Sequence, residues 1–513
     1  MSNTTKLPEK RQAGRAESPG ASGSPESLVV NDMHSGLNAT RVAEIARPTG
    51  LAEIQELTRR AHREGRSIAI AGGRHAMGGQ QFVAGDILLD TTKLNRILNL
   101  DDERGILEAE AGVQWPELLD YLWLHSPPGK EFPGWTIRQK QTGADRLSLG
   151  GALAANAHGR GLDIEPFVND VESFVLVNAR GEALTCSRSE NRELFSLVAG
   201  GYGLFGIVYS LRLRLTRRKK LRRLVELRKL RSLNEAFRDR IEEGCIYGDF
   251  QFCTDETSPD FMRLGVFSCY DPVPEQARMP AALKTLGPED WHTLYHLSHV
   301  DKAAAFRMYS SFYLSTSRQL YWSDLSQLSY YQDDYHREVD HRCGAEHPGS
   351  EVITELYVPR ERLVDFMEAA RRDFLEHGVN LIYGTIRLIR RDRDSFLKWA
   401  RGDFACVIFN LHVEHEPGDL AKNAAAFRRL IDLAREREGS FFLTYHRHGT
   451  REQVEDCYPE FREFLRLKEL HDPEGIFQSD WYRHYRGLFD EGHKDEDARD
   501  HGPTYAEELK YEA

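Results

Sequence analysis

From about residue 50 onward, the order of apolar and polar residues alternates between helical and extended periods. Residues 51–64 repeat apolar side chains at helical spacing, at Ile54, Leu57 and Ala61, which predicts an amphipathic helix. Short apolar runs bounded by glycine or charged residues predict strands. The strands are expected at 67–71, 86–90, 105–111, 171–178, 182–186 and 207–215, and further helices at 115–124 and 191–198. Short strands mixed with helices and glycine turns indicate an α+β fold.

Residues 217–450 differ from this first part because they carry longer elements and more aromatic and charged residues. Their pattern predicts a strand, a turn and a helix over 356–377, a strand over 404–416 and a helix over 420–438. We therefore expect two domains with flanking segments. These are a disordered tail at 1–27, a first domain at 28–216, a second domain at 217–450, a C-terminal segment at 451–490 and an acidic tail at 491–513.

Composition narrows the class of protein. The net charge of −12 argues against non-specific nucleic-acid binding, and the basic stretch 217–223 is interpreted as the solvated face of a strand. No apolar run approaches the roughly 18 residues of a transmembrane helix, and the polar start lacks the apolar core of a secretory signal. Seven scattered cysteines without a C-x-x-C pair suggest neither a zinc site nor disulfides, so a reducing cytoplasm is the expected setting. These features do not determine the oligomeric state.

Three glycine-rich stretches are candidates for phosphate binding. The first, Ala71 to Gly79, follows a predicted strand, and the second runs from Ser148 to Gly159. Glycines allow backbone N–H groups to approach a pyrophosphate closely. The third, Gly201 to Gly206, satisfies G-x-G-x-x-G, but a predicted helix precedes it and a predicted strand follows it. Because a dinucleotide fingerprint needs the opposite order, we do not expect a Rossmann site.

Taken together, these stretches resemble the vanillyl-alcohol oxidase / p-cresol methylhydroxylase (PCMH-type) superfamily of FAD-linked oxidases. The resemblance is nearest to the sugar-lactone and alditol oxidase and decaprenylphosphoryl-ribose oxidase branches. It is carried by residues 67–75, 87–96, 107–115, 149–159, 200–207 and 471–480. It implies a two-part FAD-binding domain at 28–216, an α+β cap domain with an antiparallel sheet at 217–450, and a C-terminal segment that returns to the FAD domain.

The resemblance implies FAD as cofactor, held by the glycine stretches and a C-terminal aspartate. The residues expected to bind it are Gly72, Gly73, Arg74, His75, Ala76, Gly79, Gln80, Thr142, Gly143, Ser148, Gly150, Gly151, Asn156, His158, Gly159, Gly203, Gly206, Ile207 and Asp480. In many relatives, a histidine at the position of His75 is bonded covalently to the flavin, and we expect the same here. The alternative is that His75 only forms hydrogen bonds within its loop, since Arg74 and Ala76 replace the commoner Gly and Ser. Ala144 and Asp145 stand where some relatives carry a second, cysteine link, so a double link is not expected.

Polar residues two apart on predicted strands share one face and suggest a sheet that faces the substrate. Four such strands are expected, within 351–359, 383–389, 409–414 and 443–448. The candidate catalytic residues are Arg387, His412, Glu355, Asn410, Tyr445 and His446, and for each the alternative is a solvated or structural role. The resemblance supports Arg387 from alditol oxidases, and Glu355, Asn410 and His412 from decaprenylphosphoryl-ribose oxidases. The late lysine of both groups is absent, and no metal is expected because His412 and His415 would lie on opposite faces of a strand.

The reaction implied is hydride transfer from a CH–OH group of a sugar, alditol, lactone or other small alcohol to flavin N5. A base takes the hydroxyl proton, and O2 or another acceptor reoxidises the flavin. Two alternatives remain open from the sequence. One is oxidation of a C–N bond, as in cytokinin dehydrogenases. The other is a flavin-binding protein without catalysis.

Overall fold

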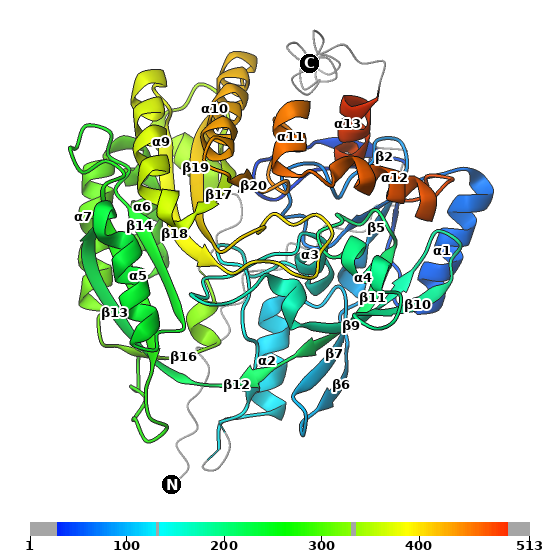
Figure 1. Ribbon diagram of the computed structural model, residues 1–513, viewed down its shortest axis with the longest axis horizontal. Helices are drawn as coiled ribbons and strands as arrows, with labels where there is room; N and C mark the ends of the chain where they lie inside the picture. The colour runs from blue at the N-terminus through cyan, green and yellow to red at the C-terminus, as the bar shows by residue number, and fades with distance from the viewer. Residues whose placement is uncertain (1–27, 130–132, 330–334, 491–513) are drawn as a thin grey trace.

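The computed structural model describes residues 28–129, 133–329 and 335–490. The tails expected at 1–27 and 491–513 lie outside these residues. The described chain forms a three-stranded parallel sheet, a five-stranded antiparallel sheet and an eight-stranded antiparallel sheet, with helices packed around them (Figure 1). The α+β class expected from the sequence is confirmed.

The parallel sheet consists of β3 (Glu44–Ala46), β5 (Ile87–Asp90) and β4 (Ile68–Ala71), in that order, and helix α1 (Leu51–Glu64) connects β3 to β4. Helix α1 has the bounds that its spacing predicted. Its buried side chains Ile54, Leu57 and Ala61 pack against Ile68 and Ile87. This packing holds the end of β4, and therefore the first glycine loop, in a fixed place.

The five-stranded sheet runs through β10 (Ala183–Ser187), β9 (Val171–Val177), β11 (Ile207–Arg214), β7 (Ile106–Glu110) and β6 (Ile97–Asp101). Helices α2 (Trp115–His125), α3 (Leu149–Ala154) and α4 (Arg192–Val198) share its hydrophobic core. Helix α4 precedes residues 201–206 and β11 follows them. The order is thus the reverse of a dinucleotide fingerprint, as the sequence predicted.

The eight-stranded sheet runs through β16 (Leu320–Trp322), β13 (Lys220–Lys229), β15 (Leu264–Pro272), β14 (Tyr247–Phe252), β18 (Leu381–Ile389), β19 (Phe404–Glu414), β17 (Gly349–Pro359) and β20 (Ser440–Phe441). Three of the four polar strands expected from the sequence are therefore neighbours, as β18, β19 and β17. Glu355 pairs with Ile408, and Ile408 pairs with Thr385. Polar side chains two apart on these strands consequently share one face of the sheet.

Helices cover both faces of this sheet. Helices α5 (Leu233–Glu242), α9 (Leu363–His377) and α10 (Pro417–Arg435) lie on the apolar face. There Phe374 of α9 packs on Phe409 of β19 with ring centroids 5.1 Å apart. Helices α6 (Pro288–Val300), α7 (Lys302–Ser315) and α8 (Tyr335–Cys343) lie on the polar face and enclose a cavity against it.

The sequence pattern did not predict α6, α7 and α8. Their aromatic side chains, such as Tyr295, Tyr309 and Tyr313, line a partly polar cavity instead of packing in the core. A helix that faces a cavity does not need a continuous apolar stripe, so its periodicity is weak.

The strand expected at 443–448 is wrong, because the chain turns after β20. The carbonyl oxygens of Leu443 and Thr444 accept hydrogen bonds from the Gln80 side chain, each at 3.0 Å. The Leu443 oxygen also accepts one from Trp481. Side chains from distant segments thus form the hydrogen bonds that these backbone groups would form in a strand, and the chain leaves the sheet at this point.

The C-terminal helices α11 (Arg451–Cys457), α12 (Phe461–His471) and α13 (Asp480–Phe489) lie beside the earliest elements of the chain (Figure 1). Residue Phe477 forms a parallel bridge with Ile68 of β4. Two short ribbons, β1 (Leu28–Val30) with β2 (Thr40–Val42) and β8 (Trp135–Thr136) with β12 (Thr216–Arg217), complete the described elements. Among the described helices, none has the apolar length needed to cross a membrane.

Candidate functional site

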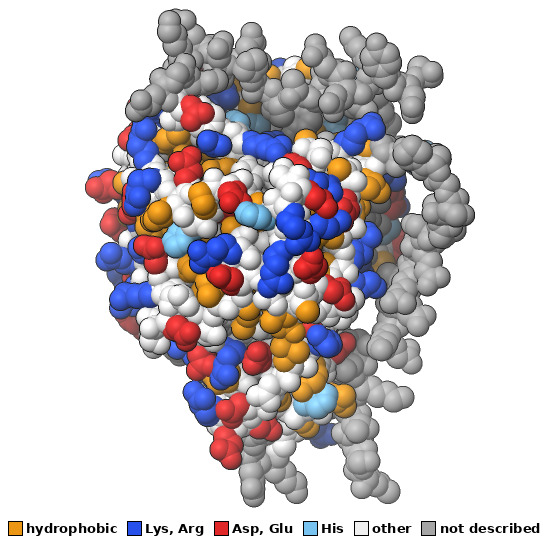
Figure 2. Space-filling model, turned by 90° about the vertical axis from the view of Figure 1, so that its right-hand side faces the viewer, with side chains coloured by type: hydrophobic (Ala, Val, Ile, Leu, Met, Phe, Trp, Pro, Cys, Tyr) orange, Lys and Arg blue, Asp and Glu red, His pale blue; other side chains and the backbone are white. Residues whose placement is uncertain are grey.

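A cavity of about 610 Å³ lies between the glycine-rich loops and the polar face of the eight-stranded sheet. This volume is typical of sites for cofactors and small substrates. The outer surface is different in character. On the face shown in Figure 2, positive and negative side chains are interspersed without a large patch of one sign.

The first two glycine loops touch each other along one wall of the cavity. A Cβ atom at Gly72 would lie 2.1 Å from Ser148 Oγ, and one at Gly73 would lie 2.3 Å from the carbonyl oxygen of Arg146. Only glycine fits at these positions. Arg74 has a positive φ of 56°, a backbone conformation found in nests whose N–H groups bind phosphate oxygens. The wall therefore offers the close backbone approach that a dinucleotide cofactor requires.

Most of the residues expected to bind FAD line this cavity. They are Gly72, Gly73, Arg74, His75, Ala76, Gln80, Thr142, Gly143, Ser148, Gly150, Gly151, His158, Gly203 and Gly206. Gly79, Asn156, Gly159, Ile207 and Asp480 lie close by without lining it. The Asn156 amide donates to Asp392 at 2.8 Å and Ile207 is in the hydrophobic core, so both support the cavity wall without facing the cavity.

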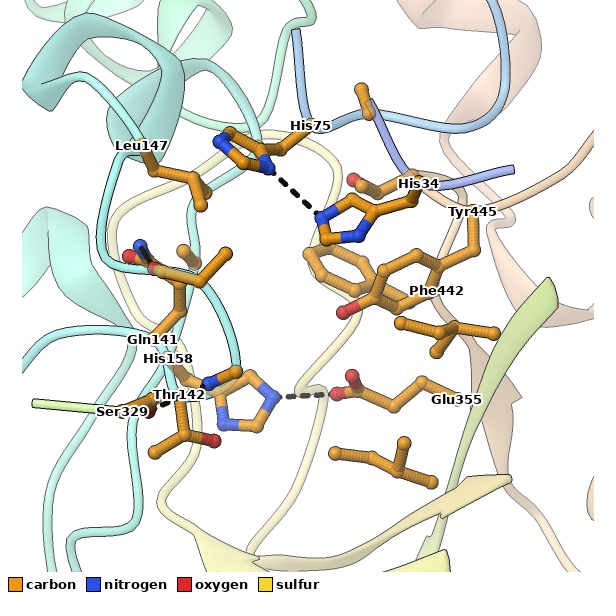
Figure 3. A pocket seen from close by; sticks show the side chains of 18 of the residues that line it. His34, His75, Gln141, Thr142, Leu147, His158, Ser329, Glu355, Phe442 and Tyr445 are labelled. Atoms are coloured by element: carbon orange, nitrogen blue, oxygen red, sulfur yellow. Dashed lines mark hydrogen bonds and ion pairs between the residues drawn. The ribbon is translucent and has the colours of Figure 1, made fainter. Parts of the chain in front are cut away.

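His75 faces a second histidine across the top of the cavity (Figure 3). Its Nδ1 lies 2.9 Å from Nε2 of His34, a residue between β1 and β2. Burial, with the charges of His34 and Arg146, lowers the pKa of His75 to about 3. The imidazole is therefore neutral at physiological pH, which is the form that acts as a nucleophile. Sequence reasoning missed His34 because no motif connects it to the glycine loop.

His158 and Glu355 form a buried pair at the opposite end of the view in Figure 3. His158 Nε2 lies 2.5 Å from Glu355 Oε1, and His158 Nδ1 lies 3.0 Å from the carbonyl oxygen of Gly159. The same Oε1 accepts hydrogen bonds from the Tyr357 hydroxyl at 2.5 Å and the Cys406 thiol at 3.1 Å. Burial alone would raise the pKa of Glu355, but attraction to His158 and these hydrogen bonds lower it to about 2. Glu355 is therefore an ionised carboxylate inside the cavity.

The other candidate catalytic residues divide into two groups. Arg387, Asn410 and Tyr445 line the cavity together with Glu355, whereas His412 and His446 do not line it. His446 instead bonds to Thr354 at 3.2 Å and stacks on Phe427 of α10, and burial lowers its pKa to about 3.

His412 belongs to a second cluster, farther along β17. Glu351 Oε1 lies 2.9 Å from Nε2 of His299 on α6 and 3.4 Å from Nδ1 of His412. These three residues, like His158, Glu355 and Cys406, are close enough together to hold a metal ion. In both clusters the donor and acceptor atoms already bond to one another. His415, the other histidine of the 412–415 stretch, turns away and bonds to Ser350 at 2.9 Å.

Sequence reasoning also missed the residues that α6, α7 and β13 bring to the cavity. His299, Tyr309 and Arg223 all line it. Their only signal in the sequence was an aromatic and basic composition in 217–330, which fits many other arrangements.

Comparison with known proteins supports the assignment of the glycine loops. Residues 42–187 match the family model of the FAD binding domain. Cytokinin dehydrogenase 2 of Arabidopsis thaliana is 24% identical over 489 residues, covering 88% of this chain and 91% of that protein. An L-gulonolactone oxidase of Scyliorhinus torazame is 27% identical over 161 residues, covering 31% of this chain and 34% of that protein. An uncharacterised oxidoreductase, ORF5 of the fasciation locus of Rhodococcoides fascians, is 30% identical over 172 residues, covering 33% and 36% respectively.

The chain thus spans about a third of the length of the last two relatives and most of the first. The matched domain and the cavity lined by its glycine loops define an FAD-dependent oxidoreductase. The matched FAD binding domain and these relatives support the resemblance to the PCMH-type superfamily of FAD-linked oxidases that the motifs predicted. Its cofactor is FAD.

Proposed function

We propose that this enzyme oxidises a CH–OH group of a small polyol, sugar or lactone. The observation that carries the proposal is that an ionised, buried carboxylate, Glu355, lines the same cavity as the FAD loops. When bound, FAD supplies the chemistry by accepting the hydride of the C–H bond at N5. The protein then has to orient the alcohol and accept its hydroxyl proton.

Glu355 is the proposed proton acceptor. Its Oε1 is occupied by three donors, none of which bonds to Oε2, and Tyr445 lies close to Glu355 (Figure 3). A carboxylate with a lowered pKa is a weak base. It is sufficient here because the hydroxyl becomes strongly acidic as the hydride leaves and a carbonyl group forms. Arg387, Asn410 and Tyr445 line the cavity and are proposed to bind the substrate oxygens. Burial and the nearby Glu355 raise the pKa of Tyr445, so its hydroxyl stays protonated and can donate a hydrogen bond.

We also propose that His75 holds FAD covalently. Its neutral imidazole and the fixed contact with His34 support this role. A covalent bond would prevent cofactor loss and, by withdrawing electrons, raise the reduction potential of the flavin.

Oxidation of a C–N bond is the second candidate, supported by the similarity to a cytokinin dehydrogenase over most of the chain. Arg223 and Arg387 would repel a protonated amine, whereas Asp249, Glu351 and Glu355, which line the same cavity, would attract one. Charge by itself therefore does not separate the two candidates, and the donor panel does.

Anaerobic mixing of the purified flavoprotein with a donor panel tests the proposal. Alditols, sugars and lactones are expected to bleach the flavin absorbance, and matched amines are not. Bleaching by amines alone would establish the second candidate, and bleaching by no member of a broad panel would contradict both.

A further inference from the structure

Three arginines meet at the part of the cavity formed by β13, β14 and β18. Arg387 lies on β18, Arg223 lies on β13, and Arg160 follows the second glycine loop. All three line the cavity. We call Arg160, Arg223 and Arg387 the arginine end of the pocket.

Arg387 has the least exposed side chain of the three and has no acidic partner among the described residues. It is 9% exposed, and its buried Nε has no hydrogen-bond partner in the described chain. Among the described residues, no carboxylate lies within 4.0 Å of its guanidinium. Gln251 pairs with Thr385, so the same antiparallel register sets Asp249 opposite Arg387 without a direct ion pair.

Arg160 and Arg223 stack on a shared aromatic ring. The Arg160 guanidinium lies 4.7 Å from the ring centroid of Tyr270, and that of Arg223 lies 5.2 Å from it. Arg160 Nη1 is 3.4 Å from an oxygen of Asp249. Arg223 donates only to neutral oxygens, at 2.8 Å to the Tyr270 hydroxyl and 3.1 Å to Thr316, among the described residues.

The charges at the arginine end do not balance within the described chain. Of the described carboxylates, only Asp249 pairs with a member of the three, and Glu355 is already paired with His158. The nearby Asp145 is already paired with Lys140 at 2.7 Å, so it does not balance the charge of the arginines. Among the residues that the structure describes, two of these three positive charges therefore have no carboxylate within 4.0 Å. An unpaired buried charge is costly, and an arginine fork matches a carboxylate or phosphate in shape.

We propose that the arginine end binds an oxyanion carried by the substrate, so that the natural donor is an anionic polyol such as a sugar acid or a sugar phosphate. Arg387 and Arg160 supply the hydrogen bonds, and Arg223 adds charge across the Tyr270 ring. The assignment of this anion to the substrate rests on the proposed oxidation of a CH–OH group.

The location explains why this anion is distinct from the phosphates of FAD. Arg387 and Arg223 belong to strands of the eight-stranded sheet, whereas the first glycine loop follows β4 of the parallel sheet and lines the cavity from there. Arg387 pairs across the sheet with Cys406, which donates to Glu355. A donor whose anion binds Arg387 would thus bring a nearby hydroxyl to the proposed proton acceptor.

A binding experiment tests the subsite without catalysis. Inorganic phosphate and sulfate are titrated separately into the FAD-loaded enzyme, with calorimetry and the flavin spectrum as readouts. Saturable binding is expected, and Arg160→Gln and Arg387→Gln should each weaken it about tenfold or more. The matched control is Arg222→Gln, because Arg222 is exposed on the same strand as Arg223 and pairs with Asp271. Arg160→Lys, which keeps the charge, should retain part of the binding and shows that the site remains folded.

A kinetic experiment identifies the anion. A neutral hexitol, the corresponding sugar acid and the terminal phosphate ester are compared as donors in anaerobic flavin reduction. One of the charged donors should have a KM about tenfold or more below that of the neutral hexitol. Arg223→Gln and Arg160→Gln should remove this difference by raising the KM of the charged donor alone.

Two results would overturn the subsite: no binding of phosphate or sulfate to the wild-type enzyme, or equal binding to the Arg160→Gln and Arg387→Gln variants. A lower KM for the neutral hexitol than for both charged donors would reject an anionic substrate while leaving alcohol oxidation intact. If no donor bleaches the flavin, the proposed oxidation fails, and the titration still reports on the anion site by itself.

Discussion

His158 and Glu355, which are 197 residues apart in the chain, form a buried contact of 2.5 Å between Nε2 and Oε1. The contact joins the second glycine loop to β17 of the eight-stranded sheet. It lowers the pKa of Glu355 in a place where burial alone would raise it. The proposed proton acceptor therefore depends on a residue of the second glycine loop.

Replacing Glu355 by Gln is expected to slow flavin reduction by about 10²- to 10⁴-fold, the usual contribution of a positioned general base. The amide keeps the shape but cannot accept the proton. Stopped-flow anaerobic reduction measures this rate. The exposed Glu361 offers a matched control, and Glu361→Gln should reduce as fast as the wild type. An unchanged rate in Glu355→Gln would exclude this residue as the proton acceptor.

Replacing His158 by Gln should change the pH dependence of the reaction. In the wild type, the pKa of about 2 keeps Glu355 ionised throughout the accessible range, so its titration leaves no acid limb. Without His158 the pKa of Glu355 rises, and the rate should fall with decreasing pH at about pH 4–6. The measurement is the reduction rate constant as a function of pH. A profile that stays flat in His158→Gln would mean that His158 does not set the ionisation of Glu355.

Replacing His75 by Ala tests the covalent link. Acid precipitation of the wild type is expected to leave the yellow colour in the pellet, because the proposed bond to His75 would keep the flavin on the protein. In His75→Ala the colour should move to the supernatant, while the glycine loops still bind FAD without a bond. Release of the flavin from the wild-type protein would show that His75 is only a neighbour of the cofactor.

Replacing Gly73 by Ala should weaken FAD binding. The added Cβ would lie 2.3 Å from the Arg146 carbonyl oxygen, so the two loops must separate. Overpacking of this kind costs about 1–3 kcal/mol, or roughly ten- to a hundredfold in affinity. The ratio of flavin to protein absorbance after purification measures the loss. Gly50→Ala is the control because no atom lies within 4 Å of the position of its Cβ.

The buried His446 predicts sensitivity to acid. Its pKa is about 3 in the folded protein, below the ordinary 6.5, so between these values only the unfolded chain binds the proton. Stability therefore falls as pH decreases through this window, by roughly 2 kcal/mol between pH 6.5 and 5. Denaturant unfolding at the two pH values measures the loss, which should be smaller in His446→Gln. An equal loss in the variant would assign the acid sensitivity to other groups, such as His484.

The sequence by itself determined the features that depend on local geometry. The spacing of Ile54, Leu57 and Ala61 predicted α1, because the helical period depends only on residues that are close in the sequence. The glycine loops at 71–79 and 148–159 were recognisable because close backbone approach requires glycine itself. Alternation along β17 likewise assigned Glu355 and Tyr357 to one face.

Only the tertiary structure decided which of these residues meet. The contacts of His75 with His34 and of His158 with Glu355 join segments that have no common period or motif. The turn at 443–448 is held by hydrogen bonds from side chains more than 30 positions away. Helices α6 to α8 face a partly polar cavity, so their sequences lack a clear apolar period. Burial and charge balance are properties of the packed chain, because they depend on every element around a group. For that reason the low pKa of Glu355 and the unbalanced arginine end became visible only in the folded protein.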